Sequence, residues 1–144
     1  MEPMELIEQA FARSEHNLDR GLDGFPLERA AEPPGGEARS FDDILRHLVG
    51  CDLWFLSCVR IDASDAPVSR EDIEAAGGEK LVALRRTLRE YTLAKLRAAG
   101  DEALADPPEK YDYPSCLDLW LYAAEHDFWH AGQVQMLKML FAHQ

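Results

Sequence analysis

Basic residues are scarce in this sequence, and they form no dense cluster. The 144 residues include 15 Lys and Arg but 27 Asp and Glu, which gives a formal net charge of −12 at pH 7. Proteins that follow a nucleic acid backbone or an anionic membrane surface rely on concentrated positive charge. We therefore expect neither nucleic acid nor a membrane surface among the partners of this protein.

Long apolar runs and cysteine are also rare. No uninterrupted apolar run approaches the roughly 18 residues that suggest a membrane span, and the first residues, MEPMELIEQAF, are acidic where a secretory signal is basic. Of the three cysteines, Cys51 and Cys58 would lie about 10 Å apart along a helix, which is too far for a disulfide. We predict a cytoplasmic protein whose cysteines are reduced thiols.

Strand signals are missing as well, whereas helix signals recur along the chain. Apolar residues spaced three and four apart predict four amphipathic helices. These helices are expected near residues 3–20, 40–61, 79–99 and 115–142, with one short turn after Ser69. Ser40 and Ser115 each precede an acidic residue three positions later, which favours a capped helix start, while Gly21 and Gly100 are predicted helix ends.

The connections between these helices are long. Stretches of roughly 14–19 residues separate them, whereas simple helical hairpins use only a few residues. A chain of 144 residues, 47% of them hydrophobic, is long enough to bury one core. We therefore predict one all-α domain over residues 1–144, a four-helix bundle in which at least one connection crosses the bundle end.

The stretch HDFWHAGQ, residues 126–133, places two histidines in the middle of an apolar helix face. His126 and His130 share one inward sector of the last helix with Leu119, Ala123, Gln133, Leu137 and Phe141. Burying an imidazole without a partner costs about 1–3 kcal/mol. Side chains at i and i+4 can converge on one divalent ion, which satisfies both imidazoles. Hydrogen bonds to other core side chains are the alternative.

Two ligands rarely hold a metal alone, so a third should come from a facing helix. His47 fits, because it lies on the flank of the apolar arc of the second predicted helix, next to Cys51 and Trp54. His16 projects away from the apolar face of its helix, and His143 lies at a fraying end. Three neutral nitrogens inside a bundle leave coordination positions open for water or substrate, as in a reactive site.

The segment RHLVGCDLWFL, residues 46–56, followed about 80 residues later by HDFWHAGQV, resembles the DinB/YfiT-like superfamily in motif and spacing. That superfamily consists of small four-helix bundles and includes thiol-dependent S-transferases and mycothiol-dependent maleylpyruvate isomerases. Its metal-binding members use one histidine of the second helix and an HxxxH pair of the last. The resemblance implies these roles for His47, His126 and His130.

Three further residues are candidates for contact with a metal ligand or a bound substrate. Cys51, one turn after His47, is a soft metal ligand, a reactive thiol or, as we favour, a small buried apolar side chain. Gln133 could orient a histidine ligand through a hydrogen bond, or it could bond a neighbouring helix. Tyr91, predicted to face the core, could donate to a substrate or could pack with a satisfied hydroxyl.

The last predicted helix carries a second apolar sector, nearly opposite the histidines. Leu117, Leu121, Phe128 and Met139 line this sector, where a helix that covers one side of a core should be polar. A long loop could cover these side chains. We favour a homodimer interface through this helix.

These observations lead to three hypotheses about function. The first is a metal-dependent transferase or hydrolase, such as a thiol S-transferase, in which a three-histidine site activates a low-molecular-weight thiol or water for a small-molecule substrate. Imidazole ligands and the affinity order of divalent metals favour Zn or Ni. The second is a bundle that binds metal or a small ligand without turnover. The third is a metal-free dimeric bundle whose histidines form a polar core cluster.

Overall fold

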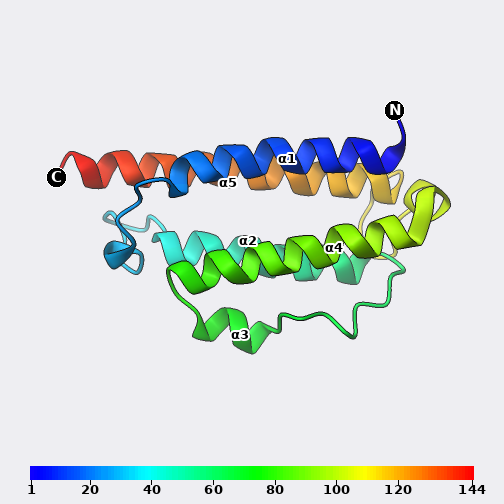
Figure 1. Ribbon diagram of the computed structural model, residues 1–144, viewed down its shortest axis with the longest axis horizontal. Helices are drawn as coiled ribbons and strands as arrows, with labels where there is room; N and C mark the ends of the chain where they lie inside the picture. The colour runs from blue at the N-terminus through cyan, green and yellow to red at the C-terminus, as the bar shows by residue number, and fades with distance from the viewer.

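The computed structural model describes residues 1–144, and the chain contains helices but no strands. Its elements are α1 (Pro3–Leu22), a short 3-10 helix η1 (Leu27–Arg29), α2 (Phe41–Cys58), α3 (Arg70–Ala75), α4 (Glu79–Ala105) and α5 (Cys116–Ala142) (Figure 1). The predicted all-α class is confirmed: four long helices form the bundle, and the short α3 lies outside it. None of these helices combines the length and the hydropathy that a bilayer span requires.

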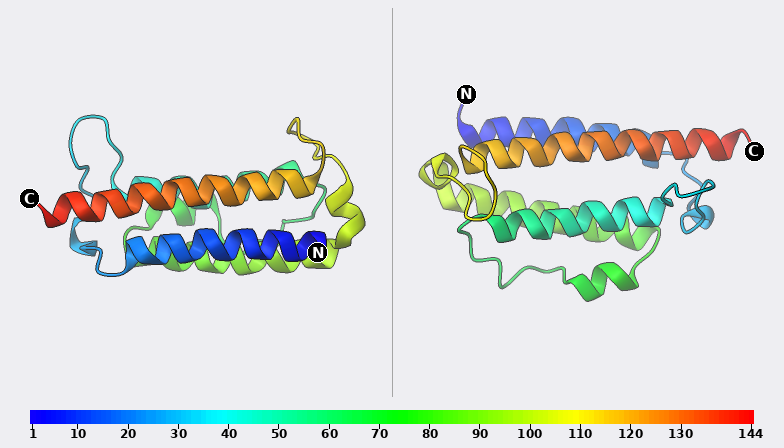
Figure 2. Two further views of the ribbon diagram at one scale, coloured as in Figure 1. Left: turned by 90° about the horizontal axis from the view of Figure 1, so that it is seen from above. Right: turned by 180° about the vertical axis from the view of Figure 1, so that it is seen from behind.

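The bundle has two layers, with α1 beside α5 and α2 beside α4 (Figures 1 and 2). Helices α1 and α5 run in the same direction, as the order of the contacts between them shows. Gln135 donates to the backbone oxygen of Asn17, and Lys138, further along α5, donates to those of Arg20 and Asp23, further along the chain. Helices α2 and α4 are parallel as well, since the connection over residues 59–78 returns along the outside of the bundle and carries α3 on its way. The predicted crossing of a bundle end is made instead by the connections over residues 23–40 and 106–115, which pass from one layer to the other (Figure 1).

Serine side chains fix the starts of three helices. The hydroxyls of Ser40, Ser69 and Ser115 each accept a hydrogen bond from the backbone N–H three residues later, at 3.2, 3.1 and 3.1 Å. These bonds satisfy N–H groups that have no partner within their own helix. The predicted starts of α2 and α5 are therefore confirmed.

The predicted end of α2 is wrong, because this helix ends at Cys58 and not near Ile61. Gly100 adopts φ 80° and ψ 173°, outside the helical region, so the regular part of α4 ends there as predicted. Glycine accepts such a positive φ at little steric cost. Beyond this kink a short helical segment continues to Ala105.

Gly21 departs from its predicted role as a helix end. It lies inside α1, which ends one residue later at Leu22. A Cβ at position 21 would lie 2.9 Å from Cγ1 of Val134 and 3.3 Å from the backbone nitrogen of Gln135. The glycine thus allows the backbones of α1 and α5 to approach closely.

One continuous core of 30 buried apolar residues runs through the bundle. On α5, the apolar members of the predicted inward sector are all buried, namely Leu119, Ala123, Leu137 and Phe141. His130 is buried among them, whereas His126 is half-buried and Gln133 is exposed. The histidines therefore lie at the edge of the core, where a site can be both structured and open to solvent.

Candidate metal centre

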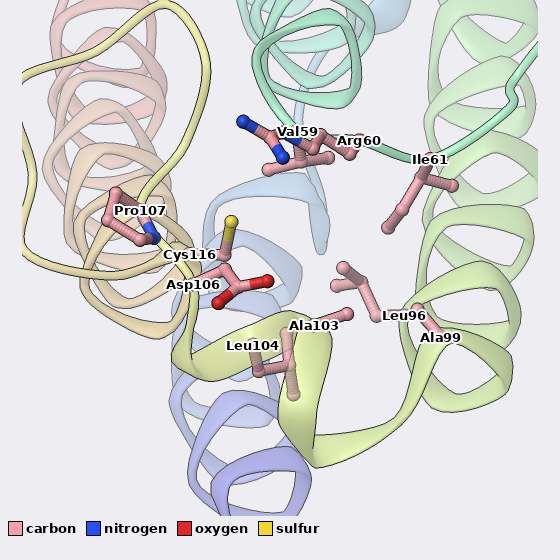
Figure 3. A pocket seen from close by; sticks show the side chains of 10 residues that line it. All are labelled: Val59, Arg60, Ile61, Leu96, Ala99, Ala103, Leu104, Asp106, Pro107 and Cys116. Carbon is pink, nitrogen blue, oxygen red and sulfur yellow. The ribbon is translucent and has the colours of Figure 1, made fainter.

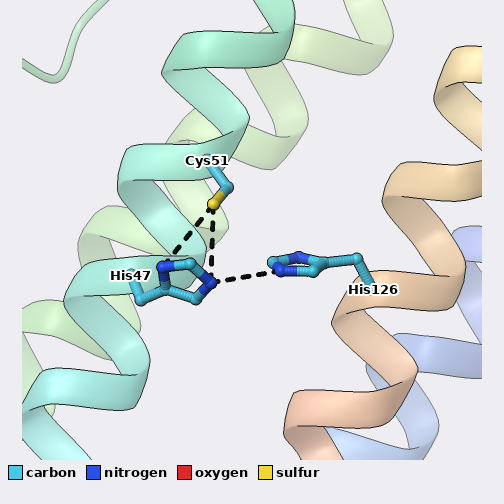
Figure 4. A group of neighbouring side chains, drawn as sticks. All are labelled: His47, Cys51 and His126. Carbon is cyan, nitrogen blue, oxygen red and sulfur yellow. Dashed lines mark hydrogen bonds between the residues drawn. The ribbon is translucent and has the colours of Figure 1, made fainter.

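Three histidines from two helices meet at this edge. His47 comes from α2, and His126 and His130 come from successive turns of α5. Nε2 of His126 lies 3.1 Å from Nε2 of His47 and 3.1 Å from Nε2 of His130. The three ring centroids are 4.5 to 5.0 Å apart, and Figure 4 shows the His47 and His126 rings facing each other across the gap between the helices.

The distances between the nitrogens match those of ligands that share one ion. Two nitrogens, each about 2.0–2.1 Å from a zinc ion and separated by a tetrahedral or right angle, lie about 2.8–3.4 Å from each other. Both 3.1 Å contacts fall within this range. Each of these two pairs is therefore spaced as two ligands of one divalent transition metal.

Hydrogen bonds alone explain these contacts less well. Nδ1 of His130 lies 2.6 Å from Oε1 of Gln133, so it donates its proton to the amide oxygen, and Nε2 of a neutral His130 keeps a lone pair. Nε2 of His126 carries either one proton or one lone pair, so only one of its two contacts can be a well-formed hydrogen bond. Nδ1 of His126 is buried without any partner. A shared cation would satisfy all three Nε2 atoms.

The surroundings of His47 and His126 favour their neutral forms, which metal ligation requires. Burial is the largest cause that lowers the pKa of His47, and the neighbouring His130 and His126 add to it, so that this pKa falls to about 4. Burial and the charge of His130 also lower the pKa of His126. At neutral pH the two rings therefore compete little with protons for a metal.

Cys51 lies at this site and also packs against the core, partly buried. Its Sγ is 3.7 Å from Nε2 and 3.8 Å from Nδ1 of His47, and one ligand atom each of Cys51, His47 and His126 lie within 4.8 Å of one another (Figure 4). The nearly equal distances place the sulfur beside the ring rather than on the line along which Nε2 points. Burial, followed by the charges of Asp52 and Asp127, raises the pKa of this thiol to about 11, so without a metal it stays protonated.

The structure does not bring Tyr91 to the histidines. Its hydroxyl donates to Oδ1 of Asp65 at 2.6 Å, and Asp65 belongs to the exposed connection between α2 and α3. Tyr91 packs against the core from α4 with a satisfied hydroxyl, which is the second of the two predicted roles, and the structure does not place it as a donor at the histidines. By contrast, Gln133 makes the predicted bond to a histidine.

A buried network of ion pairs lies next to the candidate centre. Oδ2 of Asp127 accepts from Nη2 of Arg85 at 2.9 Å and from Nη2 of Arg89 at 2.6 Å. Nη2 of Arg89 also donates to Asp52 at 2.8 Å, and Arg85 pairs with Glu15 at 2.5 Å. The network joins all four long helices. Because Asp127 directly follows His126, it also fixes how α5 presents its histidines.

Sequence reasoning missed this network. Arg85 and Arg89 are four residues apart on the same face of α4 as the buried Leu81 and Leu88. A pair of arginines within an apolar stripe is a signal for buried carboxylate partners, because an unpaired buried charge is costly. The sequence does not indicate which carboxylates those partners are.

A small cavity near the kink of α4 is separate from the metal centre. Its volume is about 40 Å³, and its lining includes Val59, Leu96, Leu104 and Cys116 (Figure 3). No histidine lines it. The cavity is apolar for the most part and offers no group of ligands.

Comparison with known proteins identifies the family of the chain. No curated protein and no solved structure matches the chain. A family model described as the DinB superfamily matches residues 10–134, which include all three histidines of the centre. The chain therefore belongs to the DinB superfamily.

Proposed function

We propose that this protein is a metal-dependent enzyme in which His47, His126 and His130 bind one divalent transition metal, either Zn or Ni. One observation carries the proposal: Nε2 of His126 lies 3.1 Å from Nε2 of both other histidines, as in ligands that share an ion. Membership of the DinB superfamily supports a metal at this place. Imidazole-rich sites suit Zn and Ni well.

The proposed reaction uses a low-molecular-weight thiol or water as the nucleophile, so the enzyme is a transferase, such as a thiol S-transferase, or a hydrolase. When bound, the ion lowers the pKa of a thiol or water ligand and so supplies a nucleophile at neutral pH. The chain contributes three neutral nitrogens and leaves the remaining coordination positions free for small molecules. Gln133 fixes the ring of His130 through Nδ1, so that its Nε2 stays available.

Aromatic side chains limit the access of water on one side of the centre. The rings of Phe55 and Tyr122 lie 6.4 and 6.2 Å from the ring of His126, and Tyr113 packs on Tyr122 at 5.6 Å. A partly dry site strengthens electrostatic interactions with a reacting group. The side beyond Gln133 is more exposed.

Cys51 favours a second candidate, a bundle that binds metal without turnover. A fourth protein ligand would close the coordination sphere, as in structural zinc sites. Cys51 is the only cysteine within reach of the histidines. We favour the open site, because the sulfur lies beside the His47 ring and its raised pKa keeps it protonated without a metal.

Metal content per chain tests the proposal. We would purify the protein without a metal-affinity tag and measure metals by plasma mass spectrometry in wild type and in His47→Ala, His126→Ala and His130→Ala. We expect near one equivalent of Zn or Ni in wild type and a large loss in each variant, because two remaining imidazoles hold an ion weakly. His16→Ala, an exposed histidine of α1, is the control that should retain the metal.

Cys51→Ser separates the two candidates. Retention of the metal in this variant would support an open three-histidine site and justify assays of thiol transfer and hydrolysis, whereas loss of the metal would favour the closed site. Wild-type protein that binds no metal, even after incubation with Zn or Ni, would contradict both.

A further inference from the structure

A groove opens beside the metal centre, between the start of α2, the second half of α5 and the connection that precedes α2. Its volume is about 350 Å³, within the range of small-molecule sites. One wall is apolar and includes Ile44, Met136, Leu137 and Leu140. The polar side chains that line the groove are those of Glu37, Arg39 and Gln133.

The groove adjoins the centre through Gln133. Ile44 precedes His47 by three residues on α2, and Gln133 follows His130 by three residues on α5, so the groove begins about 4.5 Å along each helix from a histidine. Gln133 belongs to both, because it lines the groove and accepts the bond from Nδ1 of His130. A molecule in the groove would therefore lie next to the candidate metal ligands.

Arg39 supplies the positive charge of the groove. It is exposed and makes no ion pair or hydrogen bond, although the chain carries 27 acidic residues. It lines the groove together with Gln133, whose side chain contacts His130. Glu37 lines the same groove.

Two apolar side chains of the wall are left uncovered. Met136 and Leu140 are 56% and 45% exposed, on a helix whose other face is buried. Covering such side chains with an apolar ligand is favourable. An arginine without a partner recognises carboxylates through its planar fork of donors. The net charge of −12 disfavours ligands with more than one negative charge.

We propose that this groove binds a small organic monocarboxylate with an apolar body, whose carboxylate pairs with Arg39 and whose body lies on Met136 and Leu140. That this ligand is the substrate of the enzyme rests on the function proposed above. The binding itself does not, because Arg39 and the apolar wall belong to the chain whether or not a metal is present.

Binding of octanoate tests the proposal, with the neutral isostere octanamide beside it. Isothermal titration calorimetry would measure both probes on wild type, Arg39→Gln and Arg70→Gln, each zinc-loaded and chelator-treated. Arg70 is an exposed arginine without an ion pair at the start of α3, so Arg70→Gln makes the same change of charge away from the groove. We expect Arg39→Gln to weaken octanoate about tenfold in both metal states. Octanamide should be unaffected, and Arg70→Gln should behave as wild type.

Met136→Ser tests the apolar wall, and its exposed position leaves the fold intact. We expect it to weaken octanoate and octanamide alike, and we expect acetate, which lacks the body, to bind too weakly to measure. Acetate that binds as tightly as octanoate would contradict the apolar part of the proposal. Octanoate that binds equally to wild type and Arg39→Gln would overturn the proposal.

The two metal states separate this proposal from the function. Octanoate that binds only to zinc-loaded protein, independently of Arg39, would show that the ion holds the anion, and the groove proposal would fail while the metal centre stands. Octanoate that binds through Arg39 in a protein without metal affinity would support the groove while the proposed function fails.

Discussion

Single residues of the metal centre are held neutral by their surroundings, and this has a measurable effect on stability. The pKa of His47 falls from its usual 6.5 to about 4, chiefly through burial. A histidine whose pKa is lower in the folded than in the unfolded state takes up a proton on unfolding, so stability is lost as the pH falls from about 6.5 towards 4. We expect the free energy of unfolding of the metal-free wild type to fall more over this range than that of His47→Gln. The expected difference is about 1–2 kcal/mol, a value reduced because the ring is partly exposed to solvent.

Urea unfolding of chelator-treated protein, at neutral pH and at about pH 4.5, measures this difference. His16→Gln is the matched control, because His16 is exposed and its loss should leave the pH dependence of wild type unchanged. The same slope in wild type and His47→Gln would contradict a desolvated His47.

At the scale of elements, the contact between α1 and α5 depends on Gly21. Alanine at this position would gain about 1 kcal/mol of helix propensity. Its Cβ would meet Val134 at 2.9 Å and the backbone of Gln135 at 3.3 Å, and such overpacking costs about 1–3 kcal/mol. We expect Gly21→Ala to lower the free energy of unfolding by about 1 kcal/mol, as measured by urea denaturation.

Gly132→Ala is the control for this prediction. Gly132 lies on the exposed side of α5, and a Cβ there has no neighbour within 4 Å. Alanine should therefore stabilise the protein by about 0.5–1 kcal/mol through helix propensity alone. Gly21→Ala that stabilises the protein as much as Gly132→Ala would show that the two helices separate without cost.

Features fixed by local sequence could be predicted, and those that depend on contacts between helices could not. The capped starts at Ser40 and Ser115 and the HxxxH pair on one face of α5 follow from spacing within one helix. That Gly21 lies within α1 depends on the close approach of α5, which the sequence of α1 alone does not show.

Three features of the site illustrate the same limit. The pairing of Arg89 with Asp52 joins α4 to α2, and nothing within either helix specifies it. Tyr91 lies close to the core face of α4, but its hydroxyl bonds Asp65 of another segment, and no pattern within α4 indicates this partner. Arg39 lies in a connection, where no periodicity shows which way a side chain points. The histidines were therefore predictable, and most of their neighbours were not.

At the scale of the whole molecule, the outer side of α5 exposes apolar side chains that nothing in the monomer covers. Phe128 and Met139 are 51% and 56% exposed, so no loop covers them, and they remain candidates for a dimer interface. Leu117 and Leu121, predicted to share this surface, are half-buried, and Leu117 packs against the core. The part of the predicted interface that is free to pair thus extends from the middle of the helix towards its C-terminal end.

We propose that two chains pair through Phe128 and Met139. Light scattering after size-exclusion chromatography should give twice the chain mass of 16.3 kDa, and Phe128→Lys should give the monomer mass, because a lysine in an apolar contact loses hydration without a partner. Glu90→Lys, an exposed position of α4, makes at least as large a change of charge and should stay dimeric. Each chain carries a net charge of −12, so salt should strengthen the dimer by screening the repulsion between chains. A monomer at all protein and salt concentrations would leave Phe128 and Met139 as a surface for another partner.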